Sequence, residues 1–282
     1  MIRIAFWLSA LTIAGLSAAA AQTPVERGRY LVETIAACGN CHTPKGPDGP
    51  VKGRELAGGF VIEEPPFRAV ASNITPDPET GTGRWSDAEI ALAIREGRRP
   101  DGSLIGPPMP FAFYRGLADA DVAAMVAYLR SVPPVHNAVA KSEYRMPLPP
   151  NWGPPIGSVT APPRANAVAY GAYLAGPVGH CLDCHTPMLA GGGRDMGRVG
   201  AGGQRFEGPW GVSVAANLTA HKESGLGGWS DQEIERAIRQ GIAQSGRPLN
   251  PPMGFGYYAA IAPEDMTALI AYLRTLAPLK SD

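Results

Sequence analysis

The chain has 282 residues, and its 25 basic and 25 acidic side chains give a formal net charge of zero. This balance provides no general attraction to nucleic acid or to an anionic lipid surface, so neither is expected as the main partner. Hydrophobic residues make up 45% of the chain and are interleaved throughout, which excludes a disordered protein, while 35 glycines and 29 prolines predict long loops between few helices.

The N-terminal segment is typical of an export signal. Arg3 precedes an apolar run that extends from Ile4 to about Ala21, and small residues crowd the end of this run. We interpret residues 1–21 as a signal peptide that directs a bacterial protein to the periplasm. The run is almost long enough to remain as an uncleaved membrane anchor, and this alternative stays open.

A helix expected at about 25–37 leads into the pentapeptide Cys-x-x-Cys-His, which occurs twice and uses every cysteine of the chain. The two copies are Cys38-Gly39-Asn40-Cys41-His42 and Cys181-Leu182-Asp183-Cys184-His185. Two thiols at this spacing can bond to the two vinyl groups of one porphyrin, while the following histidine reaches the iron. The motif therefore predicts two covalently bound haem c groups.

Three other uses of the cysteines are less compatible with this pattern. A thioredoxin-like redox pair requires one Cys-x-x-Cys beside a βαβ unit, which the sequence does not show. A tetrahedral zinc site has no use for a histidine directly after each pair. A disulfide framework suits a small secreted domain without a core, not a chain of this length.

After the first motif, the sequence predicts two more helices separated by a stiff loop. Ser86 and Glu89 form a capping box for a helix that closes at Gly97. Pro107-Pro108-Met109 follows and cannot be helical. The last helix carries Val122, Met125, Val126 and Leu129 as one apolar stripe, which we expect to face a core.

A proline-rich segment separates the two motif-bearing parts. Residues 131–165 contain nine prolines, which oppose helix formation and favour extended backbone. Tyr144, Met146, Trp152 and Ile156 within it suggest a strap packed across a domain surface. We assign residues 136–165 as the linker.

The second part of the chain repeats the first. Residues 85–87, 107–109 and 127–130 recur as Trp229-Ser230-Asp231, Pro251-Pro252-Met253 and Ala271-Tyr272-Leu273-Arg274, each 144 positions later. Such self-similarity indicates an internal duplication. We therefore predict one domain over residues 22–135 and a second over 166–282, in which Gly176-Pro177 should end or distort the first helix.

The duplication also selects the second axial ligand of each iron. Iron held by one histidine takes either a second protein ligand, for electron transfer, or an open position, for chemistry on small molecules. Met125 corresponds to Leu269, and Met266 to Val122, so both are expected in the core, and no other histidine has a histidine counterpart. Only Met109 and Met253 are methionine in both copies. We predict these two as axial ligands, with the alternative that they merely fill the haem crevice.

With Cys-x-x-Cys-His early and a loop methionine late in each copy, the chain resembles class I c-type cytochromes. Four segments are also similar to the cytochrome subunits of bacterial alcohol and aldehyde dehydrogenases: Gly-Arg-Tyr-Leu (28–31), Asn-Ile-Thr-Pro-Asp (73–77), Trp-Ser-Asp (85–87) and Pro-Pro-Met-Pro-Phe (107–111). The resemblance implies an all-α fold of two tandem class I cytochrome c domains, each with about three or more helices and long loops around one haem. It assigns thioether bonds to Cys38, Cys41, Cys181 and Cys184, and the axial positions to His42 with Met109 and His185 with Met253.

The resemblance also implies a function as an electron carrier rather than an enzyme. A periplasmic dehydrogenase is the expected electron donor, and a downstream cytochrome or oxidase the expected acceptor. Dehydrogenase subunits of this kind carry three such domains and a membrane-attaching tail, whereas two domains are predicted here. We therefore expect membrane association that is at most peripheral or through an uncleaved N-terminal segment. The alternative is a dihaem redox enzyme, either peroxidase-like, which requires two unlike distal positions, or thiosulfate-oxidising, which requires a fifth cysteine.

Two further residue pairs are weaker candidates for contacts with the haem propionates. Asn73 and Asn217 are equally explained by turn formation. Arg95 and Arg239 are expected instead on an exposed helix face.

Overall fold

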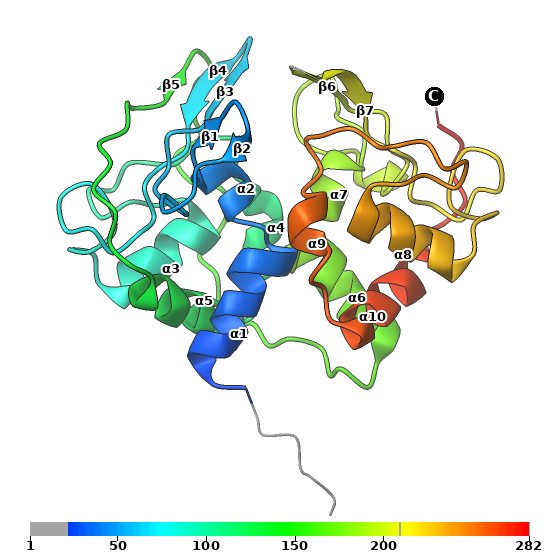
Figure 1. The fold of residues 1–282 in the computed structure, drawn as a ribbon, viewed down its shortest axis with the longest axis horizontal. Helices are drawn as coiled ribbons and strands as arrows, with labels where there is room; N and C mark the ends of the chain where they lie inside the picture. Colours follow the sequence, from blue (N-terminus) through cyan, green and yellow to red (C-terminus); the bar gives the residue numbers. More distant parts are fainter. Residues whose placement is uncertain (1–21, 209, 282) are drawn as a thin grey trace, which may run out of the picture.

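Two similar sets of helices lie side by side in the computed structural model, which describes residues 22–208 and 210–281 (Figure 1). The expected signal peptide lies outside these residues. In the first half the helical segments are α1 (Pro24–Tyr30), the π-helical turn η1 (Leu31–Ile35), α2 (Gly39–His42), α3 (Asp87–Glu96), α4 (Phe111–Tyr114) and α5 (Asp119–Ser131). In the second half they are α6 (Ala167–Tyr173), the π-helical turn η2 (Leu174–Val178), α7 (Cys181–Cys184), the 3-10 turn η3 (Met196–Arg198), α8 (Asp231–Gln240), α9 (Phe255–Tyr258) and α10 (Pro263–Leu273). Apart from η3, the two halves repeat the same order of helical segments.

The expectation of a purely helical fold was incomplete, because the long loops form short antiparallel sheets. The strands are β1 (Lys45–Gly46), β2 (Gly49–Pro50), β3 (Val61–Glu64), β4 (Phe67–Val70), β5 (Glu143–Tyr144), β6 (Arg205–Gly208) and β7 (Gly211–Val214). They pair as β1–β2, β3–β4–β5 and β6–β7. The strands are two to four residues long, too short for the alternating pattern by which a strand is identified in a sequence. Hairpins β3–β4 and β6–β7 lie at the same end of the molecule (Figure 1).

The capping boxes predicted for the middle helices are confirmed. The Ser86 side chain accepts a hydrogen bond from Glu89 N, and the Glu89 side chain accepts one from Ser86 N. The same pair of bonds joins Ser230 and Glu233 at the start of α8. Both helices end at a left-handed glycine, with φ 62° at Gly97 and 65° at Gly241.

The first helix of each half is distorted in the same way. Pro177 lies inside the π-helical turn η2, where the sequence predicted a distortion. The equivalent turn η1 contains no proline and is nevertheless π-helical. The distortion therefore belongs to the repeated unit and does not depend on the proline.

The first and last helices of each half cross at a glycine. A Cβ atom added to Gly28 of α1 would lie 1.9 Å from the Ala124 carbonyl oxygen of α5. A Cβ atom added to Gly171 of α6 would lie 1.9 Å from the Ala268 oxygen of α10. Only glycine allows the two backbones to approach this closely, which explains why this position is glycine in both copies.

The proline-rich segment packs as a strap, as expected. The described residues between α5 and α6 form no helix, and β5 pairs with β4. The Tyr144 hydroxyl accepts a hydrogen bond from Gly106 N at 3.1 Å. Trp152 donates from Nε1 to the Ile105 oxygen at 2.9 Å and stacks on Phe111 with ring centroids 5.7 Å apart. The strap therefore covers the loop that carries Met109.

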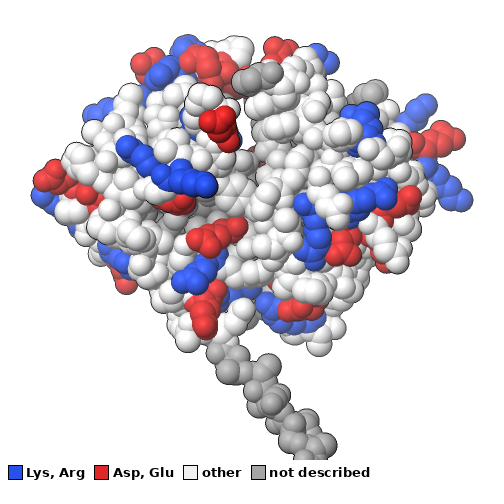
Figure 2. All heavy atoms as spheres, in the orientation of Figure 1, with Lys and Arg blue, Asp and Glu red and all other residues white. Residues whose placement is uncertain are grey.

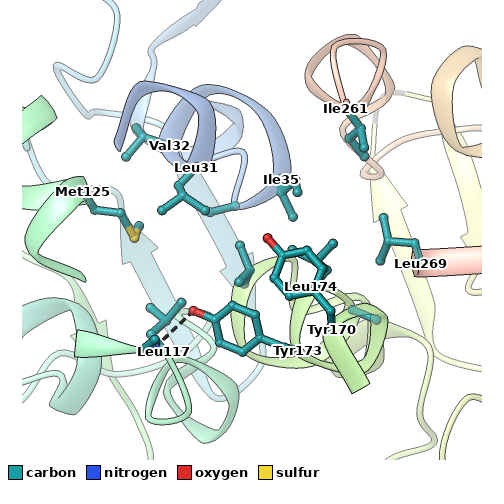
Figure 3. Packing of buried hydrophobic residues seen from close by; sticks show 14 of the residues in the cluster. Leu31, Val32, Ile35, Leu117, Met125, Tyr170, Tyr173, Leu174, Ile261 and Leu269 are labelled. Atoms are coloured by element: carbon teal, nitrogen blue, oxygen red, sulfur yellow. Dashed lines mark hydrogen bonds between the residues drawn. The ribbon is translucent and has the colours of Figure 1, made fainter. Parts of the chain in front are cut away.

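One hydrophobic core joins the two halves. Leu31, Ile35 and Met125 of the first half belong to the same buried cluster as Leu174 and Leu269 of the second half. Figure 3 shows Leu31 and Ile35 of η1 facing side chains of α6 and η2, among them Leu174, across this cluster. Because the apolar contacts continue across the boundary, we expect the halves to form one packed unit.

Two tyrosines form a reciprocal polar clasp across this core. The Tyr30 hydroxyl donates to Asp265 Oδ2 at 2.9 Å and accepts from Ala262 N at 3.0 Å. In the equivalent arrangement of the other half, the Tyr173 hydroxyl donates to Asp121 Oδ2 at 2.7 Å and accepts from Ala118 N at 3.1 Å. Figure 3 marks the bond from Ala118 N. Each tyrosine thus caps the last helix of the other half. We call these four side chains, Tyr30, Asp265, Tyr173 and Asp121, the tyrosine clasp.

The face of the molecule shown in Figure 2 carries both signs of charge. Acidic and basic side chains are interspersed over both halves on the face shown in Figure 2, as the zero net charge leads one to expect. Over the part of the chain that the structure describes, no helix is long and apolar enough to cross a membrane.

Candidate haem-binding sites

Each Cys-x-x-Cys-His motif begins a new short helix after a sharp change of backbone direction. Ala37 has φ 48° and precedes the motif in the first half, and His180 has φ 41° and precedes it in the second. These left-handed residues break the chain away from the π-helical turns. Cys38 caps α2 and Cys41 lies within it, while Cys181 and Cys184 lie at the two ends of α7, so the cysteines of each motif are one helical turn apart, as thioether attachment requires.

Both motif histidines are held in the same orientation by a backbone carbonyl. His42 Nδ1 lies 2.8 Å from the Ser72 oxygen, and His185 Nδ1 lies 2.7 Å from the Ala216 oxygen. A carbonyl oxygen only accepts hydrogen bonds, so Nδ1 carries the proton and Nε2 keeps its lone pair for a metal. Burial lowers the pKa of both imidazoles, which favours this neutral, ligating form.

Burial holds the pKa of all four cysteine thiols above its usual value. Burial raises the pKa of Cys38 to about 12 and that of Cys184 to about 12. Reactive redox cysteines have the opposite property, a lowered pKa, so a thioredoxin-like pair does not fit. All four thiols are free of disulfide bonds. Among the described residues, no three histidine, cysteine or acidic side chains are grouped to hold a metal ion.

The two repeated methionines occupy equivalent loops. Met109 follows the cis peptide bond Pro107-Pro108, and Met253 follows the cis bond Pro251-Pro252. Both side chains are half-buried, and Met109 packs against the core. Met125 and Met266 were expected in the core, and the structure confirms this with an exposure of 1% for each side chain.

The helices that follow these methionines lie near the cysteines. Burial raises the pKa of Tyr114 in α4, and the neighbouring Cys38 and Cys41 raise it further. Burial likewise raises the pKa of Tyr258 in α9, with further contributions from Cys181 and Cys184. Cys41 of the first motif also raises the pKa of Tyr258, and α9 packs against η1 while α4 packs against η2, so the segments that follow the two methionines lie where the two halves meet.

The weaker propionate candidates are engaged elsewhere. Asn73 Oδ1 accepts from Thr75 N at 3.0 Å, and Asn73 Nδ2 donates to the Val135 oxygen at 2.8 Å. Asn217 makes the corresponding bonds to Thr219 N and to the Leu279 oxygen. Turn formation therefore accounts for both asparagines.

The arginine pair differs from expectation, because Arg95 and Arg239 are not exposed. Their side chains are only 14% and 16% exposed. Arg95 bonds Asp119 at 2.7 Å, and Arg239 bonds Glu235 at 2.6 Å and the Ala259 oxygen at 2.9 Å. Each guanidinium therefore fastens its middle helix to a neighbouring segment or turn.

The carbonyl partners of the histidines could not be identified from the sequence. Ser72 and Ala216 act through backbone oxygen atoms, which any residue provides. The sequence marks these two positions only indirectly. Ser72 and Ala216 each directly precede the asparagine of a repeated Asn-x-Thr turn. That turn holds in place the carbonyl group whose oxygen accepts the hydrogen bond from histidine Nδ1.

The donor set and its orientation fit haem c. Each half offers two thiols one turn apart and an imidazole with Nε2 available, and each also carries a methionine in an equivalent loop. The cytochrome c family model matches residues 25–133.

Residues 25–133 are a cytochrome c domain. This domain implies haem c as the cofactor. Class I cytochrome c architecture, with helices and long loops around the haem, is consistent with the helices and loops of the structure.

Similar proteins extend the likeness over most of the chain. The chain is 33% identical to a subunit of the nicotinate dehydrogenase of Pseudomonas putida over 89% of its own length and 21% of that subunit. It is 30% identical to the fructose dehydrogenase cytochrome subunit of Gluconobacter japonicus over 94% of its length and 55% of that subunit. It is 28% identical to a dihaem cytochrome c-type protein of Cereibacter sphaeroides over 86% of its length and 83% of that protein. The chain thus spans about half or less of these two dehydrogenase subunits and most of the dihaem protein.

Proposed function

We propose that the chain is a periplasmic dihaem c-type cytochrome that carries electrons from a dehydrogenase to a downstream cytochrome or oxidase. The observation that supports this most strongly is the equivalence of the two sites. Both halves contain a Cys-x-x-Cys-His helix, a histidine oriented by a carbonyl at Nδ1, and a methionine in the same loop. Matched sites suit repeated one-electron exchange better than they suit a reaction at one open site.

We assign the attachment and axial roles residue by residue. Cys38 and Cys41 would form the thioether bonds of the first haem, with His42 and Met109 as its axial ligands. Cys181, Cys184, His185 and Met253 would serve the second haem in the same way. Bound haem c supplies an iron that cycles between the ferric and ferrous states. A thioether opposite an imidazole favours the ferrous state, so both sites should have relatively high potentials.

The protein's own residues would keep these sites closed. The carbonyl bonds to His42 and His185 fix the imidazole rings, and packing of the following helices holds the methionine loops. A peroxidase-like enzyme requires one site to differ, yet both halves present Pro-Pro-Met. A thiosulfate-oxidising enzyme with a cysteine ligand requires a fifth cysteine, and the chain has four.

A dehydrogenase is the proposed donor because several relatives are cytochrome subunits of dehydrogenases. We propose two domains at residues 22–135 and 166–282, joined by the 136–165 linker, and the repeated order of helical segments supports this division. Export by residues 1–21 would place the chain in the periplasm, where membrane association would be at most peripheral or through an uncleaved N-terminal segment.

Haem quantitation and a redox titration of the purified protein test this function. We expect two covalently bound haems per chain and two reversible one-electron steps. A single haem, or turnover of peroxide or thiosulfate at a rate typical of an enzyme, would contradict the proposal. Co-purification from the native host would identify the donor.

A further inference from the structure

The loop that carries Met253 is seated on the Cys-x-x-Cys-His helix of the other half. Asn40, between the two cysteines of the first motif, donates from Nδ2 to the Pro252 oxygen at 3.0 Å. A Cβ atom added to Gly39 would lie 2.8 Å from the Tyr257 hydroxyl oxygen. A Cβ atom added to Gly254 would lie 3.6 Å from Asn40 Nδ2. Residues immediately before and after Met253 therefore contact the first motif.

The reciprocal contact is apolar. The Tyr114 ring of α4 meets His180 edge to face, with centroids 5.6 Å apart. A Cβ atom added to Gly116 would lie 2.8 Å from Pro177 Cγ. Asp183 occupies the position of Asn40 in the second motif, but its carboxylate pairs with Arg194 at 2.9 Å. The loop carrying Met109 thus packs closely against the other half, and within the described part of the chain Asp183 makes no hydrogen bond to it that corresponds to the one from Asn40.

The surroundings of Asn40 define the direction of its amide group. Nδ2 faces a carbonyl oxygen, which can only accept, while Oδ1 lies 3.5 Å from Lys45 Nζ, which can only donate. An aspartate at this position would keep the shape and the contact with Lys45. It would lose the donor and would set a carboxylate against the Pro252 oxygen.

We propose that Asn40 is a positioning residue for Met253, so that the attachment helix of the first site holds the distal loop of the second. This inference rests on the proposed dihaem function. Asn40 fixes the carbonyl of the residue next to Met253 and thereby limits how far the thioether can move away. The first site has no equivalent restraint from Asp183, and the two sites should therefore differ in how easily their methionine is displaced.

Imidazole titration of the oxidised Asn40→Asp protein tests this role. Imidazole competes with a methionine ligand, so its apparent affinity reports the opening of each loop. Loss of one hydrogen bond should raise the apparent imidazole affinity at the Met253 site about fivefold. The Met109 site should stay unchanged, although Asn40 belongs to the first motif. The potential of the second site should fall as its loop loosens.

Single variants made in the wild-type background show which titration phase belongs to which haem site, and one of them is a matched control. The titration phase that shifts to tighter imidazole binding in Met253→Ala belongs to the second site, and the phase that shifts in Met109→Ala belongs to the first. Asp183→Ala should leave imidazole affinity at the Met109 site unchanged. Asn40→Ala introduces no charge and serves as a second test if the aspartate reduces haem loading.

Two different failures can be distinguished. An Asn40→Asp protein whose Met253 site binds imidazole within twofold of wild type, or whose two sites change equally, would overturn the positioning role. A wild-type protein with fewer than two haems, or one whose spectrum is indifferent to Met253→Ala, would instead overturn the proposed function on which this role rests.

Discussion

At the scale of residues, the chemistry depends on a few side chains and on the backbone groups that orient them. The sequence was sufficient to locate the cysteines and histidines, because attachment requires one fixed spacing. It was also sufficient to separate Met125 and Met266 from the ligand candidates, and the structure confirms both as core residues. The Ser72 carbonyl and the Asn40 contact with Pro252 could not be foreseen, because both partners are backbone oxygens distant in sequence.

Replacing Met253 with alanine tests the predicted axial ligand. We expect one of the two low-spin signals to be lost and the potential of that site to fall by an amount on the order of tenths of a volt. The measurement is optical redox titration of the purified protein. Met125→Leu is the control, because Met125 is 1% exposed in the core and its counterpart is already Leu269. An unchanged spectrum in Met253→Ala would show that another group is the ligand.

At the scale of elements, helix termini were more predictable than helix contacts. The capping boxes of α3 and α8 are local patterns of side chain and backbone, so the sequence contains all the information they need. The short strands were missed because turns, not an apolar pattern, create them. The role of Gly28 and Gly171 was also missed, since the need for glycine arises only when two helices far apart in sequence cross.

The crossing of α6 and α10 predicts a large effect of Gly171→Ala. The added methyl group would lie 1.9 Å from the Ala268 oxygen, so the helices must separate. We expect the free energy of unfolding to fall by about 3 kcal/mol. Chemical denaturation of the haem-loaded protein measures this change. Gly191→Ala is the control because no atom lies within 4 Å of its added Cβ, and a comparable loss of stability in both variants would argue against the crossing as the cause.

At the scale of the whole molecule, the duplicated halves are joined by a shared core and by the tyrosine clasp. The repeat revealed that two similar units exist, but it gave no information on how they pack. The clasp joins residues as far apart as Tyr30 and Asp265, and its aspartates are nearly buried, with 7% exposure at Asp121 and 1% at Asp265. This arrangement sets the first motif against the loop that carries Met253.

The tyrosine clasp predicts that loss of either tyrosine hydroxyl lowers the stability of the whole molecule. Tyr30→Phe removes a donor from buried Asp265 and an acceptor from Ala262 N, and Tyr173→Phe does the same at Asp121 and Ala118 N. Each change should lower the free energy of unfolding by about 1–3 kcal/mol. Unfolding should remain a single transition, because the core is continuous. Tyr272→Phe is the control, since that hydroxyl has no hydrogen-bond partner within the described residues; equal losses in all three variants would contradict the clasp.

The central claim is that both halves hold haem iron between a histidine and a methionine. The magnetic circular dichroism and electron paramagnetic resonance spectra of the oxidised wild-type protein test it most directly. We predict two low-spin haems per chain, each with histidine and methionine ligation. A high-spin haem in the protein as isolated, or a site with two histidine ligands, would contradict the account.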